Sequence, residues 1–399
     1  MEKILIFTGN YYPKPSANGI CTHQIALALT QLGYEVHIIC YKKNLEKELE
    51  EINGINVHRI EMGMVSNMRE TSQRLIDEGF RRGIFIKKIA ILLNRIKIVL
   101  YWPLYPMTSP VQAVRMYRTA KILHKDLHFK SVISVFNPID SLVAGMLMKK
   151  KYKEIKFFPY FLDSITASWG HEFISKTQLQ KKGWKWEERV FRTADKIIAM
   201  KYHESHHRDN RYSQFRDKTK YLDIPLFRPI NIDDKDNISP FEQGYVDLTY
   251  TGRLEMNNYD PWYAITLLRK ITTEHYNLRV HFYSRGSCED KLNEMMKSTS
   301  GFVVRHGFVE AQEAIRAIMF TDILISFGTA ESNMIPSKIF EYMSTGKPII
   351  HFYKQNEDVC LPYFKKYPLS LVIKESTEDK DQNIKRIQKF IQDVNGKKL

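Results

Sequence analysis

The sequence contains few cysteines, and their spacing excludes the frameworks that cysteine-rich proteins use. Four cysteines are spread over 399 residues, and no two of them form a C-x-x-C motif. This argues against a disulfide scaffold and a zinc ribbon, and it fits a reducing compartment. The apolar run that begins at Ile4 is too short for a signal-peptide core, so we expect a cytoplasmic location.

The sequence also lacks any low-complexity tract, and 43% of its residues are hydrophobic, so we expect a globular chain. A length of 399 residues exceeds what one core usually supports, which predicts two domains with a ligand-binding cleft between them. The net charge of +15 favours polyanionic partners such as nucleic acid, anionic lipid or phosphate-bearing substrates. Because no basic stripe with interleaved aromatics forms a recognised module, we do not expect nucleic-acid binding.

Short β-rich runs alternate with helical patterns in both halves of the chain, which predicts α/β domains with parallel sheets. The predicted strands are Ile4–Phe7, Val36–Cys40, Ile55–Ile60, Val132–Val135, Phe157–Phe161 and Ile197–Met200, then Val246–Tyr250, Leu278–Tyr283, Phe302–Arg305, Ile323–Ser326, Ile349–Phe352 and Leu371–Ile373. A polar stretch after Pro225 indicates a linker between the two series. Dinucleotide enzymes, periplasmic-type binding proteins and GT-B transferases all combine two such halves, but no G-x-G-x-x-G follows the first strand, which weakens the nicotinamide alternative.

Two segments place phosphate-binding groups at predicted strand ends. The first strand runs into GNYYPKPSANG, where Gly19 precedes a helical segment whose amino end offers free amides to an anion. A turn glycine without ligand contact is an equal alternative. The strand Val246–Tyr250 leads to Thr251, Gly252 and Arg253, and a guanidinium there matches a diphosphate in two hydrogen bonds. A solvated surface arginine is the alternative.

The segment from Ser332 to Ile350, SNMIPSKIFEYMSTGKPII, predicts a short helix between Pro336 and Gly346. Ser337 and Lys338 lie at its first turn, beside free amides that suit a phosphate. Glu341 shares a helix face with Lys338 and could accept hydrogen bonds from ribose hydroxyls. Spacing alone favours an ordinary surface Lys–Glu pair over a ligand site.

Four segments together resemble the retaining glycosyltransferase family 4, of the type acting in bacterial surface polysaccharide or glycoconjugate synthesis. They are ILIFTGNYYPKPSANGICTHQIALALTQLGYEVHII, YTGRL, HGFVEAQEAIRAIMFTDILISF and PSKIFEYMSTGKPII. Their order and spacing match the family nearly from end to end, most closely over residues 1–42 and 244–352.

The resemblance implies a GT-B fold, in which two Rossmann-like, doubly wound parallel-sheet domains face a central cleft. Residues 1–228 would bind the acceptor and residues 244–376 the nucleotide sugar, with residues 229–243 as linker. In residues 377–399, Ile384, Ile387, Ile391 and Val394 lie at helical spacing, which predicts an amphipathic helix that packs on one of the two domains, with the N-terminal domain as one candidate. We expect no cofactor and no catalytic metal, with a UDP-sugar as co-substrate.

The resemblance also assigns roles to the donor-site residues. In the family, an arginine at the position of Arg253 and a later lysine neutralise the diphosphate leaving group. That lysine often lies five residues beyond the arginine, where this sequence has Asn258, so Lys338 is the best substitute cation. Of two family glutamates eight positions apart, Glu341 matches the second and Asn333 replaces the first, which removes a negative charge beside the donor sugar.

The expected reaction transfers a hexosyl unit with retention of configuration, by front-face attack in which the departing phosphate helps to take the acceptor proton. Such a mechanism depends mainly on positioning and on stabilising the leaving group. Asp163, at the end of the FPYFL strand, and His171 are the polar residues that we expect near the acceptor. A purely structural role is an equal alternative for both.

His203, Glu204 and His207 spell H-E-x-x-H, a pattern that binds zinc when it lies on a helix. The charged sequence RDNRYSQFRDK follows, without a long apolar helix to bury the motif. We therefore expect a solvated, partly basic helix start and no metal.

The segment from Ile84 to Trp102, IFIKKIAILLNRIKIVLYW, is long enough to span a bilayer but carries four bases. Each charge costs about 2.5–3.5 kcal/mol at the centre of a spanning helix, so we expect a helix lying in the interface. On a helical wheel the bases and Asn94 occupy one half and the apolar residues the other. The expected contacts with anionic lipid are Arg81, Arg82, Lys87, Lys88, Arg95, Lys97 and Trp102.

A peripheral position at the inner face of the cell membrane would suit a lipid-linked acceptor, and an isoprenoid-diphosphate-linked sugar is one candidate. A core-packing helix with a solvated face is the alternative for this segment. For the chain as a whole, a sugar-nucleotide 2-epimerase would use a similar donor without an acceptor. A catalytically silent partner subunit is the third alternative, because Asn258 and Asn333 depart from the family pattern.

Overall fold

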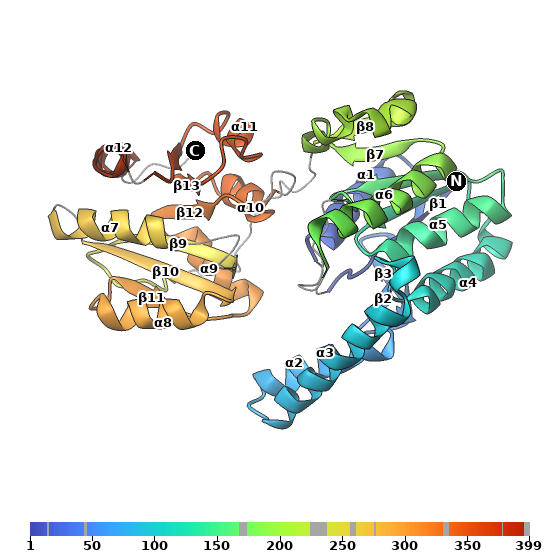
Figure 1. Cartoon of the computed structure of the whole chain (residues 1–399), viewed down its shortest axis with the longest axis horizontal. Helices are drawn as coiled ribbons and strands as arrows, with labels where there is room; N and C mark the ends of the chain where they lie inside the picture. The colour runs from blue at the N-terminus through green and yellow to red at the C-terminus, as the bar shows by residue number, and fades with distance from the viewer. Residues whose placement is uncertain are drawn as a thin grey trace. The chain divides into compact units, whose positions relative to one another are not determined.

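The computed structural model describes residues 1–13, 16–43, 46–166, 174–223, 238–255, 261–274, 277–329, 335–376 and 378–394, without the side chains of residues 77 and 272–274. The chain divides into two compact units, Met1–Pro225 and Leu226–Leu399. Most of the predicted linker at residues 229–243 lies outside the described residues. Each unit is an α/β domain built on its own sheet (Figure 1).

In the described part of the first unit, eight strands form one sheet in the order β3-β4-β2-β1-β5-β6-β7-β8. The strands are β1 (Lys3–Phe7), β2 (Glu35–Lys42), β3 (Leu49–Ile52), β4 (Ile55–Glu61), β5 (Ser131–Phe136), β6 (Lys156–Phe161), β7 (Ile197–Met200) and β8 (Thr219–Leu222). All pairs are parallel except β3 with β4. The strand order reverses between β1 and β5, so this is the switch point where ligands bind in open α/β sheets.

The helices of the first unit connect these strands. They are α1 (Ala17–Gln31), α2 (Met64–Asp77), α3 (Arg82–Leu100), α4 (Pro110–Leu127), α5 (Ile139–Lys151) and α6 (Lys176–Thr193), with 3₁₀ segments η1 (Trp102–Leu104), η2 (Lys201–His203), η3 (His206–Arg208) and η4 (Asn210–Lys218). Helix α2 lies against α3, and the pair extends away from the sheet (Figure 1). Gly83 permits this close approach, because a Cβ there would lie 2.8 Å from the Ser72 carbonyl oxygen.

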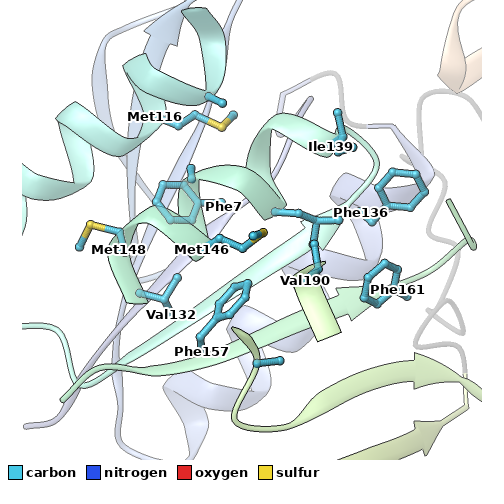
Figure 2. Close-up of a cluster of buried hydrophobic side chains, with 14 of the residues drawn as sticks. Phe7, Met116, Val132, Phe136, Ile139, Met146, Met148, Phe157, Phe161 and Val190 are labelled. Atoms are coloured by element: carbon cyan, nitrogen blue, oxygen red, sulfur yellow. The ribbon is translucent and has the colours of Figure 1, made fainter. Parts of the chain in front are cut away.

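Apolar side chains from β1, β5 and β6 form the core of the first unit together with α4, α5 and α6. Phe7, Val132 and Phe157 are fully buried and come from three adjacent strands. Figure 2 shows them beside Met146 and Met148 of α5. These strands read as apolar runs in the sequence because helices cover both faces of a parallel sheet.

In the described part of the second unit, six strands form a parallel sheet in the order β11-β10-β9-β12-β13-β14. The strands are β9 (Val246–Leu254), β10 (Leu278–Gly286), β11 (Val303–Arg305), β12 (Ile323–Phe327), β13 (Ile349–Tyr353) and β14 (Ser370–Lys374). The helices are α7 (Trp262–Glu274), α8 (Glu289–Ser298), α9 (Ala311–Phe320), α10 (Lys338–Ser344), α11 (Leu361–Phe364) and α12 (Lys380–Val394). Here the order reverses between β9 and β12.

Helix α12 belongs to the second unit. It packs against α7 and β14, and four of its apolar residues, Ile384, Ile387, Ile391 and Val394, join that unit's core. Of the two domains that the sequence left open for this helix, its apolar face is covered by its own unit.

Candidate functional site

The candidate donor site lies at the carboxyl edge of the second sheet, beside its switch point. Strand β9 pairs with β12 on one side and with β10 on the other. Gly252 and Arg253 belong to β9 itself, which extends four residues beyond its predicted end at Tyr250 to Leu254. Arg253 is therefore held by the sheet rather than by a free turn, with its side chain 69% exposed.

Two glycines allow this edge to form. Gly252 has a φ of 145°, a region that side chains disfavour. Gly286, at the end of β10, has a φ of 140°, and a Cβ there would lie 1.9 Å from the Leu254 carbonyl oxygen. The ends of β9 and β10 therefore approach each other at a distance that only a glycine at position 286 permits.

Helix α10 is fixed to β9 by a buried tyrosine. The hydroxyl of Tyr342 accepts a hydrogen bond from the Thr251 backbone N–H at 2.8 Å and lies 3.2 Å from the Thr251 carbonyl oxygen. Tyr342 lies one helical turn after Lys338, and Thr251 lies two residues before Arg253. The bridge therefore brings the two predicted cations to the same edge of the sheet.

Each predicted cation has a carboxylate partner in the structure. Lys338 Nζ lies 2.5 Å from Glu341 Oε2, which is the i,i+3 pair that the sequence predicts. Arg253 Nε donates to Glu255, and the other oxygen of that carboxylate accepts from the Ser287 backbone N–H at 3.2 Å. Burial tends to raise the pKa of Glu255, but the hydrogen bonds from Ser287 and Arg253 hold it below its usual value.

Helix α10 is shorter than predicted, since Ser337 is its N-cap and Pro336 precedes it. The Ser337 side chain makes no capping hydrogen bond. Gly346 follows the helix with a φ of 71°, as expected for a C-terminal glycine. Asn333 and Asn258 lie outside the described residues, so their proposed effects on the donor site stay predictions.

Arg285 is a further cation at this edge, and it was not among the predicted site residues. Arg285 is the register partner of Arg253 in the neighbouring strand, so the two side chains leave the sheet on the same face. Its guanidinium lies 4.3 Å from the centre of the Phe308 ring, and Phe308 is 63% exposed. Sequence spacing could not reveal this residue, because the register of β9 and β10 is a long-range property.

The first unit carries a second group of polar residues at its own switch point. A Cβ at Gly9, just after β1, would lie 2.7 Å from Pro138 Cδ, and Asn18 Nδ2 donates to the Phe136 carbonyl oxygen at 3.2 Å. Gly19 lies inside the first turn of α1, where its N–H donates to the Ser16 side chain at 3.3 Å. The helix starts at Ala17, before the predicted position, so the Gly19 amide is already capped.

Asp163 follows β6 at this same edge. Burial raises the pKa of Asp163 to about 6, and Asp163 in turn contributes, after burial, to the raised pKa of Cys21 on α1. Its carboxyl group therefore lies near α1. His171, the other predicted acceptor-side residue, lies outside the described residues.

A buried carboxylate that the sequence analysis missed holds the loop after Asp163. Glu187 of α6 accepts from Ser164 Oγ at 2.6 Å, from the Thr166 backbone N–H at 3.2 Å and from the Tyr212 hydroxyl at 2.7 Å. Glu187 is 1% exposed, so these donors replace the water that the charge would otherwise require. Glu187 therefore positions the loop that carries Asp163.

Both histidines of the H-E-x-x-H motif are buried while Glu204 is exposed, so the prediction of a solvated helix start is wrong for the histidines. His203 and His207 are 0% and 4% exposed and lie in the 3₁₀ segments η2 and η3. Their rings pack among aromatic residues, including Phe191 of α6, and burial holds the pKa of both imidazoles below the usual value. Among the described residues, no group of metal-ligating atoms forms around this motif.

The predicted membrane segment forms α3, but its apolar and basic residues are not separated. Ala90 and Ile98 are buried, while Phe85, Leu92 and Val99 are 67%, 58% and 68% exposed. The basic residues Arg81, Arg82, Lys87, Lys88 and Arg95 are also exposed. The sequence of α3 could not predict which of its residues are exposed, because it does not show which side of the helix α2 covers.

Two predicted lipid contacts are engaged within the fold. Lys97 Nζ donates to Ser109 Oγ at 2.6 Å, and burial lowers the pKa of Lys97. Trp102 packs in a small cluster with Ile98, and Lys182 Nζ lies 4.3 Å from the centre of its ring. Within the described residues, no helix combines the length and apolarity needed to cross a bilayer.

Comparison with known proteins identifies the fold. No family model matches the sequence, and no curated protein matches it significantly. Sucrose-phosphate synthase from Thermosynechococcus elongatus superimposes with a TM-score of 0.60 at 11% identity, over 99% of this chain and 90% of that chain. The catalytic domain of starch synthase IV from Arabidopsis thaliana, bound to ADP and acarbose, gives 0.58 at 10% identity, over 98% and 94%.

A UDP-N-acetylglucosamine 2-epimerase is also similar, with a TM-score of 0.51 at 11% identity over 99% of this chain and 91% of that chain. These likenesses, together with the two Rossmann-like sheets, show that the chain has the GT-B fold.

Proposed function

We propose that the protein is a glycosyltransferase that moves a hexosyl unit from a nucleoside-diphosphate sugar, foremost a UDP-sugar, to a glycan acceptor. The observation that carries the proposal is the Tyr342–Thr251 bridge, which holds Lys338 and Arg253 at one edge beside the switch point. Two cations fixed there suit a diphosphate leaving group. The GT-B likeness supports the same class, since starch synthase IV carries ADP in its structure.

In this proposal Arg253 and Lys338 stabilise the negative charge that develops on the departing diphosphate, with Arg285 as a further cation. Glu341 accepts hydrogen bonds from the ribose hydroxyls once Lys338 turns towards phosphate, and Ser337 donates its hydroxyl to a phosphate oxygen. Transfer proceeds with retention and without a catalytic metal, as the resemblance to family 4 implies. Asp163, whose pKa is raised to about 6, lies on the acceptor side.

The acceptor that we favour is lipid-linked, for example through an isoprenoid diphosphate, and is reached by peripheral binding to anionic membrane at the inner face of the cell membrane. This part of the proposal is supported by the exposed apolar residues of α3, which lie among exposed bases. An ordinary surface helix would expose its polar residues and cover its apolar ones.

The first test is a panel of nucleoside-diphosphate sugars, measured by thermal shift and by release of nucleoside diphosphate. We expect stabilisation by one donor class, with both signals reduced in Arg253→Ala and Lys338→Ala. Arg386→Ala serves as a control, because Arg386 lies on α12 and donates to the Val372 carbonyl oxygen. Failure of every donor to bind would contradict the proposal.

Product analysis separates the remaining alternatives. A 2-epimerase would convert the donor sugar without acceptor, whereas a transferase would need acceptor for product to form. Donor binding without release or conversion would indicate a silent partner subunit.

A further inference from the structure

Three different metal-ligating side chains converge in the second unit, and none of them is a residue assigned to the diphosphate. His351 lies on β13, Asp358 lies in the turn after it, and Cys360 is the N-cap of α11. One ligand atom of each lies within 4.8 Å of the others. All three are buried, His351 and Cys360 completely.

The imidazole of His351 has one nitrogen bound and one free. Nδ1 lies 3.1 Å from the Ser326 hydroxyl, whereas Nε2 is buried without a hydrogen-bond partner and faces Asp358 Oδ1 at 3.6 Å. A buried nitrogen without a partner destabilises the fold, and a bound ion would supply that partner. A hydrogen bond at one ring nitrogen that leaves the other for a metal is the usual arrangement of histidine ligands.

The carboxylate is also held in place. Asp358 Oδ1 accepts from the Cys360 backbone N–H at 2.7 Å. Gly328, just after β12, leaves room for the other oxygen, because a Cβ there would lie 2.0 Å from Asp358 Oδ2. The site is thus shaped by β12, β13 and the start of α11.

We propose that His351, Asp358 and Cys360 bind one divalent transition-metal ion, with zinc as the expected ion. Imidazole nitrogen, carboxylate oxygen and thiolate sulfur are the ligands that zinc takes in proteins. Metal–ligand bonds of about 2.0–2.3 Å place tetrahedral ligands about 3.3–3.8 Å apart, which the His351–Asp358 separation already meets. A water molecule completes the coordination, and small side-chain rotations close the longer separations.

The ion would have a structural role, because it would cross-link β13, the turn after it and the start of α11. Cysteine binds zinc as the thiolate, so the Cys360 thiol has to lose its proton when the ion binds. Metal binding therefore releases the thiol proton to solvent and forms the metal–sulfur bond. This inference is independent of the proposed sugar transfer and assigns the metal no part in it.

The test uses the full chain, purified without chelator and dialysed against zinc, with metal measured by inductively coupled plasma mass spectrometry. We expect about one zinc per chain in the wild type. Cys360→Ser and Asp358→Asn should lose most of it. Cys288→Ser, which alters another buried cysteine of the same unit, should keep it.

A second measurement does not depend on the variants folding. Wild-type protein stripped of metal and given Co²⁺ should show a thiolate charge-transfer band and the visible bands of tetrahedral cobalt. Absence of both bands, or zinc retained equally by Cys360→Ser, would overturn the proposal. The cluster would then be a hydrogen-bonded Cys–Asp–His chain.

Discussion

Arg253 Nε donates a hydrogen bond to the Glu255 carboxylate. A phosphate that binds Arg253 must therefore replace this carboxylate or bind beside it. Removing that charge should favour phosphate, so we expect Glu255→Gln to tighten nucleoside-diphosphate binding about two- to fivefold, as for a partly exposed ion pair. Glutamine still offers an acceptor to the Ser287 N–H, which limits structural damage. Calorimetric titration with UDP measures the change. Glu188→Gln, whose partner is Arg192 on α6 of the first unit, is the matched control, and weaker binding by Glu255→Gln would contradict this account.

Substitution of Gly286 should disturb the edge that the ends of β9 and β10 form. Alanine there combines backbone strain with a clash against the Leu254 carbonyl oxygen, so we expect a loss of about 2–5 kcal/mol in the free energy of unfolding. Gly301→Ala is the control, because Gly301 also has a positive φ but nothing lies within 4 Å of its Cβ position. Urea unfolding compares the two, and equal losses would show that the clash is relieved without cost.

Asp163 has its pKa raised to about 6 in the folded chain, above the value near 4 of an unfolded aspartate. The folded state then binds more protons between these values, so stability falls as the pH rises through this range and stays lower above it. Asp163→Asn removes the buried charge. We expect its melting temperature to exceed that of the wild type at pH 7.5, and the advantage to shrink at pH 5. An advantage independent of pH would refute the burial of this carboxylate.

At the scale of the element, α3 exposes an apolar stripe that its own unit does not cover. We expect Phe85→Ser, Leu92→Ser and Val99→Ser together to weaken binding to anionic vesicles at least about tenfold, with little change in melting temperature. Vesicle co-sedimentation measures the binding. Ile122→Ser is the control, since this exposed residue lies on α4. Unchanged vesicle binding in the triple variant would remove α3 from the proposed membrane contact.

Elements differed in how far the sequence could predict them. Apolar runs such as Ile197–Met200 were predicted with their observed bounds, because burial on both faces leaves a strong local signal. Strands β3 and β8 were missed, since LEEI and TKYL are short and half exposed and form only by pairing with β4 and β7. Helix α12 was predicted from its period, but the period could not say which surface it covers.

The same limit applies to the candidate site. The Lys338–Glu341 pair follows from i,i+3 spacing and was predictable. Arg285, Glu187 and the Tyr342 bridge depend on strand register and helix packing, which local spacing does not encode. The burial of His203 and His207 was likewise not predictable, because it depends on packing against α6, whose sequence lies before the motif.

At the scale of the whole molecule, many histidines are kept neutral by the fold. Burial lowers the pKa of His23, His58, His124, His203, His206, His207 and His306. Because these side chains bind more protons when unfolded, stability is present above the unfolded pKa near 6.5 and is lost as the pH falls below it.

We therefore expect the melting temperature to fall markedly between pH 7 and pH 5, which scanning fluorimetry at constant ionic strength measures. The raised pKa values of Asp140 and Asp163 act in the opposite direction but are fewer. A melting temperature that is constant or rises over this interval would contradict the burial of these imidazoles.

The bridge between Tyr342 and Thr251 has a consequence for the thermodynamics of ligand capture. Folding itself brings the strand of Arg253 and the helix of Lys338 together, so the conformational entropy of assembling two cations is lost before any anion arrives. A diphosphate then has to reorient two side chains and nothing larger. Binding of the diphosphate to the wild type should accordingly be fast and limited by side-chain rearrangement. In Tyr342→Phe, which lacks the bridging hydroxyl, association should be slower and more temperature-dependent.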